Sequence, residues 1–205
     1  IDFTQYHFDT DQWYSPKNLP IGRPFPILSS RSCPNRCSFC SMWLIHGPKF
    51  RSRSANHVLD EIESLYHRFG ARYFEFMDDN LTFDRKRILE ICRGIVARNL
   101  NIQFSTPNGV AVNKMDKEVV DALVAAGMIR LALAIEHGSG YIRNKVMHKG
   151  LNIEKVYKVV EACAQHKHLY IIGYFVVGMP QETADTLEET YSIIKELPLD
   201  HFQIN

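Results

Sequence analysis

The feature that most constrains the fold of this chain is a regular alternation of short apolar segments with helical patterns. We predict strands at 25–30, 73–77, 102–105, 129–135, 169–177 and 201–205. Helical patterns separate them at 54–70, 85–98, 117–126, 153–166 and 184–197, with a further short helical turn at 141–146. Strands that alternate with helices in this way form a parallel sheet with right-handed crossovers, either doubly wound or curled into a barrel.

The position of the polar residues favours the barrel. Residues unsuited to a core follow five of the six predicted strands: the cysteines after 25–30, then 78–80, 106–109, 136–139 and 178–180. Polar groups at so many strand ends indicate a shared site on one barrel face, whereas a doubly wound sheet gathers its ligand groups at one switch point. We therefore predict an α/β fold, a partial (β/α)6 TIM-like barrel of parallel strands that is open on one side.

Composition sets broad limits on location and partners. The 205 residues are 45% apolar, which suits one globular core, and 24 basic against 23 acidic residues give a net charge of +1. This balance gives no global electrostatic argument for nucleic acid or a membrane as a partner. Because the sequence shows no apolar stretch long enough to span a bilayer and no apparent signal segment, we expect a cytoplasmic location.

Cys92 and Cys163 lie in helical patterns, and we interpret them as buried free thiols.

The ends of the chain suggest a longer protein. The sequence begins at Ile1 rather than a methionine and stops at Asn205 within a predicted strand. Residues 1–24 are rich in aromatic, Pro and Asp residues without periodicity, as in a linker or arm. We expect 1–24 to be an arm from a missing upstream domain and 25–205 to form the core barrel.

A cysteine loop follows the first predicted strand, with Cys33, Cys37 and Cys40 at C-x3-C-x2-C spacing. An odd number of closely spaced thiols does not suit a disulfide framework. One interpretation is a [4Fe-4S] cluster, in which three cysteines leave one iron open to another ligand. The other is a structural zinc ion with His46 as the fourth ligand, and the spacing alone leaves both open.

Several further motifs accompany this loop in order along the chain. With Phe39 directly before Cys40, they resemble the radical S-adenosylmethionine (radical SAM) superfamily, whose fold is a partial barrel of six βα units, over 25–205. The segments are SRSCP at 30–34, FMDDNLT at 76–82, NGV at 108–110, IEHGS at 135–139 and GMPQET at 178–183. They are most similar to the branch that carries a cobalamin-binding domain upstream and includes methyltransferases acting on unreactive carbon or phosphorus centres.

Some positions depart from that family pattern. Ala134, His137 and Gln181 stand where the family usually has Gly, Ser and Gly. The chain also contains no Asp-x-His-x-x-Gly cobalamin motif, so the cobalamin-binding domain is expected elsewhere in the protein. His137 has two interpretations, a solvated side chain beside the ribose site or a proton donor or axial contact to a second cofactor.

The resemblance implies a set of site residues. Cys33, Cys37 and Cys40 would hold three irons of a [4Fe-4S] cluster, leaving the fourth for the amino and carboxylate groups of S-adenosylmethionine, whose sulfur–carbon bond one electron then cleaves. The remaining implied cofactor contacts are Phe39 near the adenine, Asp78 or Asp79 at the methionine ammonium, Glu136 and Ser139 near the ribose, and Gly178 and the segment from Phe202 at the adenine.

Local alternatives remain for several of these positions. Asp79 and Asn80 are equally suited to capping the following helix, and 178–180 to forming only a turn. Arg143, Lys145 and Lys149 either meet the cofactor's carboxylate or form a solvated basic helix face.

We therefore predict a radical SAM enzyme that transfers a methyl group with cobalamin, acting on a small organic substrate with a flavodoxin- or ferredoxin-like electron donor, without nucleic acid or a membrane. The alternatives are a cobalamin-independent 5′-deoxyadenosyl-radical enzyme and a zinc-binding module without catalysis.

Overall fold

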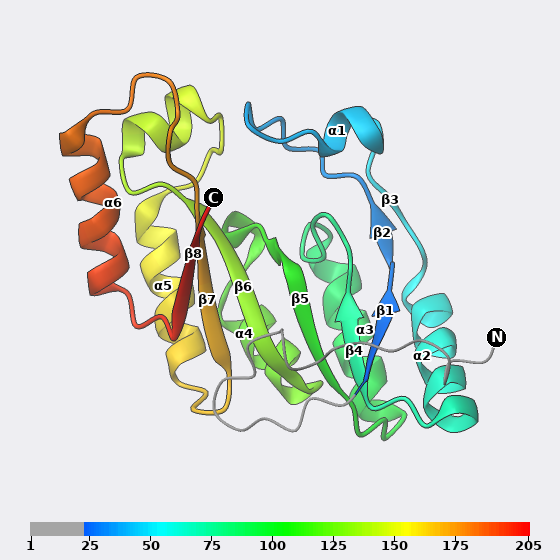
Figure 1. Ribbon diagram of the computed structural model, residues 1–205. Coiled ribbons are helices and arrows are strands. Elements are labelled where there is room, and N and C mark those ends of the chain that lie inside the picture. Colours follow the sequence, from blue (N-terminus) through cyan, green and yellow to red (C-terminus); the bar gives the residue numbers. More distant parts are fainter. Residues whose placement is uncertain (1–22) are drawn as a thin grey trace.

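The computed structural model describes residues 23–205, so the predicted arm lies almost entirely outside the described part. Six parallel strands form one sheet in the order β1-β4-β5-β6-β7-β8 (Figure 1). These strands are β1 (Pro24–Ile27), β4 (Tyr73–Phe76), β5 (Gln103–Val110), β6 (Met128–Glu136), β7 (Tyr170–Phe175) and β8 (His201–Ile204). Because each strand is added beside the previous one without a reversal of direction, the sheet is not doubly wound.

The sheet ends in two edge strands that do not pair with each other in the described part of the chain. Pro24 and Pro26 lie in β1, where the missing backbone N–H groups are tolerated because β1 pairs only with β4. Two unpaired edges make the barrel partial and open, which confirms the predicted fold class.

Helices connect the strands and cover one face of the sheet (Figure 1). They are α2 (Ala55–Phe69), α3 (Arg85–Ala97), α4 (Lys117–Ala125), α5 (Ile153–Ala164) and α6 (Ala184–Glu196). Each begins at a polar residue whose side chain accepts a backbone N–H of the first turn: Ser54, Asp84, Asp116, Asn152 and Thr183. Helix α2 ends at Gly70 in the left-handed conformation. None of the helices in this part of the chain is both long and apolar enough to span a bilayer.

The two faces of β6 pack against different parts of the molecule. Leu131, Leu133 and Ile135 belong to the main core, which also contains the buried residues of the covering helices. Ala132, between them, packs on the other face with residues of β7. Since side chains alternate along a strand, the residues next to Ile135, Ala134 and Glu136, are directed away from the helix-covered face.

The structure differs from the sequence prediction in three places. The first predicted strand is divided into β1 and the short β2 (Ser30–Arg31), which pairs antiparallel with β3 (Arg51–Ser52). Helix α1 (Met42–Ile45) and a 3-10 turn, η4 (Val112–Lys114), were not predicted. Strand β5, expected to stop at 105, continues to Val110 because a register shift between Thr106 and Val110 accommodates the Pro-Asn-Gly segment.

Candidate functional site

The cysteine loop lies between β2 and α1, beyond the carboxyl ends of the sheet strands (Figure 1). Cys37 is buried, and Cys33 and Cys40 are half-buried. Ser38 attaches the loop to the segment after β6, because its N–H donates to Met147 O at 3.0 Å and its hydroxyl to Val146 O at 2.9 Å. All five cysteines of the chain are free thiols.

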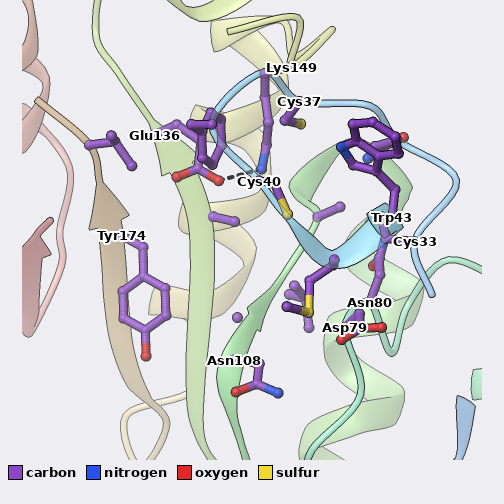
Figure 2. Close-up of a pocket in the computed structure, with 18 of the residues that line it drawn as sticks. Cys33, Cys37, Cys40, Trp43, Asp79, Asn80, Asn108, Glu136, Lys149 and Tyr174 are labelled. Carbon is purple, nitrogen blue, oxygen red and sulfur yellow. Dashed lines mark hydrogen bonds and ion pairs between the residues drawn. The ribbon is translucent and has the colours of Figure 1, made fainter. Parts of the chain in front are cut away.

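The three loop cysteines line one pocket of about 660 Å³. Figure 2 shows them with polar side chains that come from the ends of neighbouring strands. Asp79 and Asn80 follow β4, Asn108 lies in β5, and Glu136 ends β6. Carboxyl ends of parallel strands therefore meet the cysteine loop at one site, as the polar strand ends predicted.

Asp79 and Asp78 have different surroundings. Asp79 lines the pocket, and its Oδ2 accepts the backbone N–H of Ser32 at 2.7 Å and pairs with His46 Nδ1 at 2.7 Å. Asp78 does not line the pocket: its carboxylate accepts the N–H and hydroxyl of Ser29, at 3.1 and 2.7 Å, and the hydroxyl of Ser30. Of the two predicted partners for an ammonium group, only Asp79 lies at the pocket.

Asn80 is buried and directed to the cysteines, with its Nδ2 3.5 Å from Cys33 Sγ. The interpretation of Asp79 and Asn80 as caps of the next helix is wrong, because Asp84 caps α3 by accepting the N–H of Arg87.

Glu136 and Lys149 form a buried ion pair at the wall of the pocket. Lys149 Nζ lies 2.5 Å from Glu136 Oε1, and each side chain is only 8% exposed. The dashed line in Figure 2 marks this contact. Glu136 has a φ of +74°, next to the register shift between β6 and β7, a conformation that costs a residue with a Cβ on the order of 1–3 kcal/mol. Strain and a buried charge pair together fix the direction of this carboxylate.

The interpretation of the basic group as a solvated helix face is wrong for two of its three residues. Lys149 is buried against Glu136, and Arg143 is 2% exposed, with its guanidinium donating to the carbonyls of His137, Gly138 and Leu151. Burial lowers the pKa of Arg143, with the nearby Glu189 opposing that shift. Only Lys145 is exposed.

His137 is fully buried, so the solvated interpretation is wrong. Its Nδ1 accepts the backbone N–H of Ser139 at 3.0 Å, which leaves the proton on Nε2 to donate to Glu182 Oε1 at 2.9 Å. The other oxygen of Glu182 accepts the N–H of Gly178 at 2.8 Å. His137 and Glu182 thus join the segment after β6 to the segment after β7.

The other predicted cofactor contacts fall into two groups. Phe39 lines the pocket and is 36% exposed. Ser139, Gly178 and Phe202 are not among the residues that line it, and their proposed cofactor contacts stay predictions. Gly178 has a φ of +83° and precedes a turn closed by a bond from Glu182 N to Met179 O, as the turn interpretation predicted.

The donor set suits a cluster. Each cysteine of a [4Fe-4S] cluster binds a different iron, so three thiols around one pocket are sufficient and need not converge on one point. Within residues 23–205, no three His, Cys, Asp or Glu side chains are gathered around a single ion position. Burial raises the pKa of the Cys37 thiol to about 11, against a lowering by Lys149. Cluster binding must therefore displace a proton from Cys37.

Sequence reasoning assigned no role to Trp43, Asn108 and Tyr174, which line the pocket, and it did not predict the pairing of Lys149 with Glu136. Asn108 donates to Met77 O at 3.0 Å, and the Tyr174 hydroxyl donates to Pro107 O at 2.7 Å. Asn108 lay within a matched motif, which is the one signal that pointed to it. Trp43 and Tyr174 belong to apolar segments that look like ordinary core.

Comparison with known proteins places these features in a family. The profile of the Radical SAM superfamily matches residues 27–194. The chain is 28% identical over 196 residues to cytidylyl-2-hydroxyethylphosphonate methyltransferase from Streptomyces wedmorensis, covering 93% of this chain and 36% of that protein. It is 31% identical over 186 residues to bacteriochlorophyllide d C-12(1)-methyltransferase from Chlorobaculum tepidum, covering 89% and 40%.

A solved structure has a similar fold. The radical S-adenosylmethionine methyltransferase TsrM from Kitasatospora setae, with cobalamin and a [4Fe-4S] cluster bound, aligns with a TM-score of 0.78 at 23% identity, covering 87% of this chain and 34% of that one. The chain thus spans between a third and two-fifths of the length of the two methyltransferases in the sequence comparison.

Proposed function

Because this chain belongs to the radical SAM superfamily, we propose that it is the catalytic core of a cobalamin-dependent radical SAM methyltransferase that acts on a small organic substrate. The observation that carries the proposal is the pocket itself, in which three free thiols of one loop face polar residues from the carboxyl ends of successive strands. Family membership leaves the zinc-binding module without support.

Different residues of the pocket would bind the [4Fe-4S] cluster and S-adenosylmethionine. Cys33, Cys37 and Cys40 would hold a [4Fe-4S] cluster, which when bound supplies the electron for reductive cleavage of S-adenosylmethionine. Asp79 offers a carboxylate for a charge-assisted hydrogen bond with the methionine ammonium. Glu136, held by Lys149 at Oε1, would accept a ribose hydroxyl at its second oxygen.

The names of two relatives support methyl transfer, and the TsrM structure, which contains cobalamin, supports the use of that cofactor. A cobalamin-binding domain is expected outside this chain, which covers only part of those relatives. The apolar pocket wall, with Met42, Trp43, Met77 and Val176, suits the exclusion of water from the reacting groups.

We further propose a flavodoxin- or ferredoxin-like reductant and a cytoplasmic location. Five free thiols and an iron–sulfur cluster both favour a reducing compartment.

The test is electron paramagnetic resonance on the full-length protein, anaerobically reconstituted and reduced with dithionite, with and without S-adenosylmethionine. We expect a reduced cluster signal that changes when S-adenosylmethionine is added. Cys37→Ala should remove the signal, whereas Cys92→Ala, which deletes a buried thiol outside the pocket, should keep it. Stoichiometric zinc without iron or sulfide would refute the proposal.

Product analysis separates methyl transfer from the runner-up chemistry. A cobalamin-dependent methyltransferase should form S-adenosylhomocysteine only when cobalamin is supplied. Turnover to 5′-deoxyadenosine and methionine that is indifferent to cobalamin would instead support the cobalamin-independent enzyme.

A further inference from the structure

Positive charge is concentrated in two segments beside the candidate site. Residues 23–59 contain no Asp or Glu, and neither do residues 137–153. Five exposed basic residues of these segments, which we call the basic rim, are Arg31, Arg36, Lys49, Arg51 and Lys145. The chain as a whole carries a net charge of only +1, so this local excess is balanced elsewhere.

The two segments touch each other at the cysteine loop. Ser38, between two of the cluster-binding cysteines, donates its N–H and hydroxyl to the carbonyls of Met147 and Val146. Lys145 therefore belongs to a segment in contact with the loop that carries Arg36. Arg31 directly precedes the loop, and Arg51 lies opposite Arg31 and donates to His46 O, so the basic rim lies next to the cysteine loop.

Charge within the rim is left without neutralisation. Arg31 and Arg51 lie directly opposite each other in the β2–β3 ladder, an arrangement of like charges that is unfavourable by itself. Arg51 donates only to carbonyl oxygens, those of Lys49 and His46. Among the residues that the structure describes, the ion pairs do not include any member of the rim.

The carboxylates of the pocket do not offset this field at the surface. Asp79 is almost buried and pairs with His46, and Glu136 is buried against Lys149. Four exposed acids instead lie on α6, at the opposite side of the sheet from α1 (Figure 1): Asp185, Glu188, Glu189 and Glu196. The basic rim and this group of acids therefore lie on opposite sides of the sheet.

Apolar side chains accompany the charges. Leu44 and Ile45 in α1, directly after the cysteine loop, are 67% and 64% exposed. An exposed apolar pair beside polar residues is typical of a surface that contacts another protein rather than a small anion.

We propose that the basic rim, with Leu44 and Ile45, is the docking surface of an acidic one-electron carrier protein that reduces the cluster. This rests on the proposed function, since it requires a cluster at Cys33, Cys37 and Cys40. The carrier loses one electron and the cluster gains it, with no bond formed or broken. Complementary charge would steer the carrier to the side of the molecule where the loop reaches the surface.

The test compares two matched double variants of the full-length reconstituted protein. Lys49→Glu/Lys145→Glu reverses two charges of the rim, and Lys158→Glu/Lys167→Glu makes the same change in net charge at exposed positions on and after α5. Stopped-flow absorbance records cluster reduction by a pre-reduced bacterial flavodoxin at low and at physiological ionic strength. Reduced methyl viologen, a small cationic reductant, provides the charge control.

We expect the rim variant to lower the second-order rate constant with flavodoxin about tenfold at low salt, with a smaller difference as salt screens the charges. Its reduction by methyl viologen should be no slower than that of the unmodified protein. The proposal is overturned if both double variants slow flavodoxin equally, or if neither does. It is also overturned if the rim variant loses binding of a single-stranded RNA oligonucleotide at physiological salt while flavodoxin reacts unchanged. A cluster that methyl viologen fails to reduce in the unmodified protein would refute the proposed function instead.

Discussion

The buried pair of Glu136 and Lys149 gives the sharpest stability prediction. Lys149→Met keeps most of the side-chain volume and removes the cation, which leaves the Glu136 carboxylate buried with no partner at Oε1. Both side chains are only 8% exposed, so water does little to replace the lost charge. Removing one partner of a buried pair costs about 3–5 kcal/mol.

Guanidinium unfolding of the apo-protein, followed by circular dichroism, measures this cost. The matched control is Lys117→Met, which breaks the Lys117–Asp121 pair, also joined at short range but with side chains 60% and 42% exposed. That change should cost about 0.3–0.5 kcal/mol at most. The double variant Lys149→Met/Glu136→Gln should be more stable than Lys149→Met, because no unpaired charge remains.

Two results would refute the reasoning. A cost below about 1 kcal/mol for Lys149→Met would mean that the pair behaves like an exposed one. A double variant no more stable than the single variant would mean that the loss came from packing rather than from the unpaired carboxylate.

Three further predictions concern the surroundings of the site. His137→Phe removes the hydrogen-bond partner of the Ser139 N–H and of one Glu182 oxygen, so urea unfolding should show a loss of stability of about 1–3 kcal/mol. His168→Phe, at an exposed position, is the neutral control, and an equal loss of stability in the two variants would contradict the role of His137. Gly138→Ala should lower stability by about 1–3 kcal/mol, because the new Cβ would lie 2.4 Å from backbone atoms of Glu189 and Thr190, whereas the Cβ of Gly140→Ala meets nothing closer than 3.9 Å. Thermal unfolding in which Gly140→Ala is the less stable variant, or in which the two are equally stable, would contradict this packing. Burial raises the pKa of both Cys92 and Cys163 to about 12, which leaves a thiolate fraction of about one in ten thousand at pH 8. Mass spectrometry after iodoacetamide treatment of the native apo-protein should therefore find Cys33 and Cys40 modified and Cys92 and Cys163 intact. Rapid modification of Cys92 or Cys163 would show that these thiols are not buried.

Regular elements followed from the sequence because their signals are local. The apolar spacing in 55–69 and the caps at Ser54 and Gly70 lie within a few residues of the helix they define. The short hairpin of β2 and β3 gave no such signal, since two residues are too few to show a period. In β5, the sequence predicts a strand that ends at 105, before Pro107 and Gly109, although a register shift lets the strand continue through them.

The candidate site divides in the same way. The cysteine spacing was visible because all three predicted ligands lie on one loop, and Asp79 was visible because it follows a strand closely. The pairing of Lys149 with Glu136 was not predicted, because the two residues lie 13 positions apart and the π-helix of η5 (Ile142–Val146) breaks the helical period between them. The burial of His137 depends on Glu182 and Thr190, which approach it only when α6 packs on the segment after β6.

The distribution of charge shows most clearly why the net charge of a sequence says little about its binding partner. A net charge of +1 gives no argument for a nucleic acid or membrane partner, because a sum contains no positions. The fold joins the acid-free segments 23–59 and 137–153 at the cysteine loop, through the hydrogen bonds of Ser38, and places the acids of α6 across the sheet from α1. The same residues then produce a field with a direction, and the direction leads to the loop where an electron must enter. Composition leaves the partner undefined. The fold, by giving each charged residue a position, predicts both the sign of the partner's charge and the place where it binds.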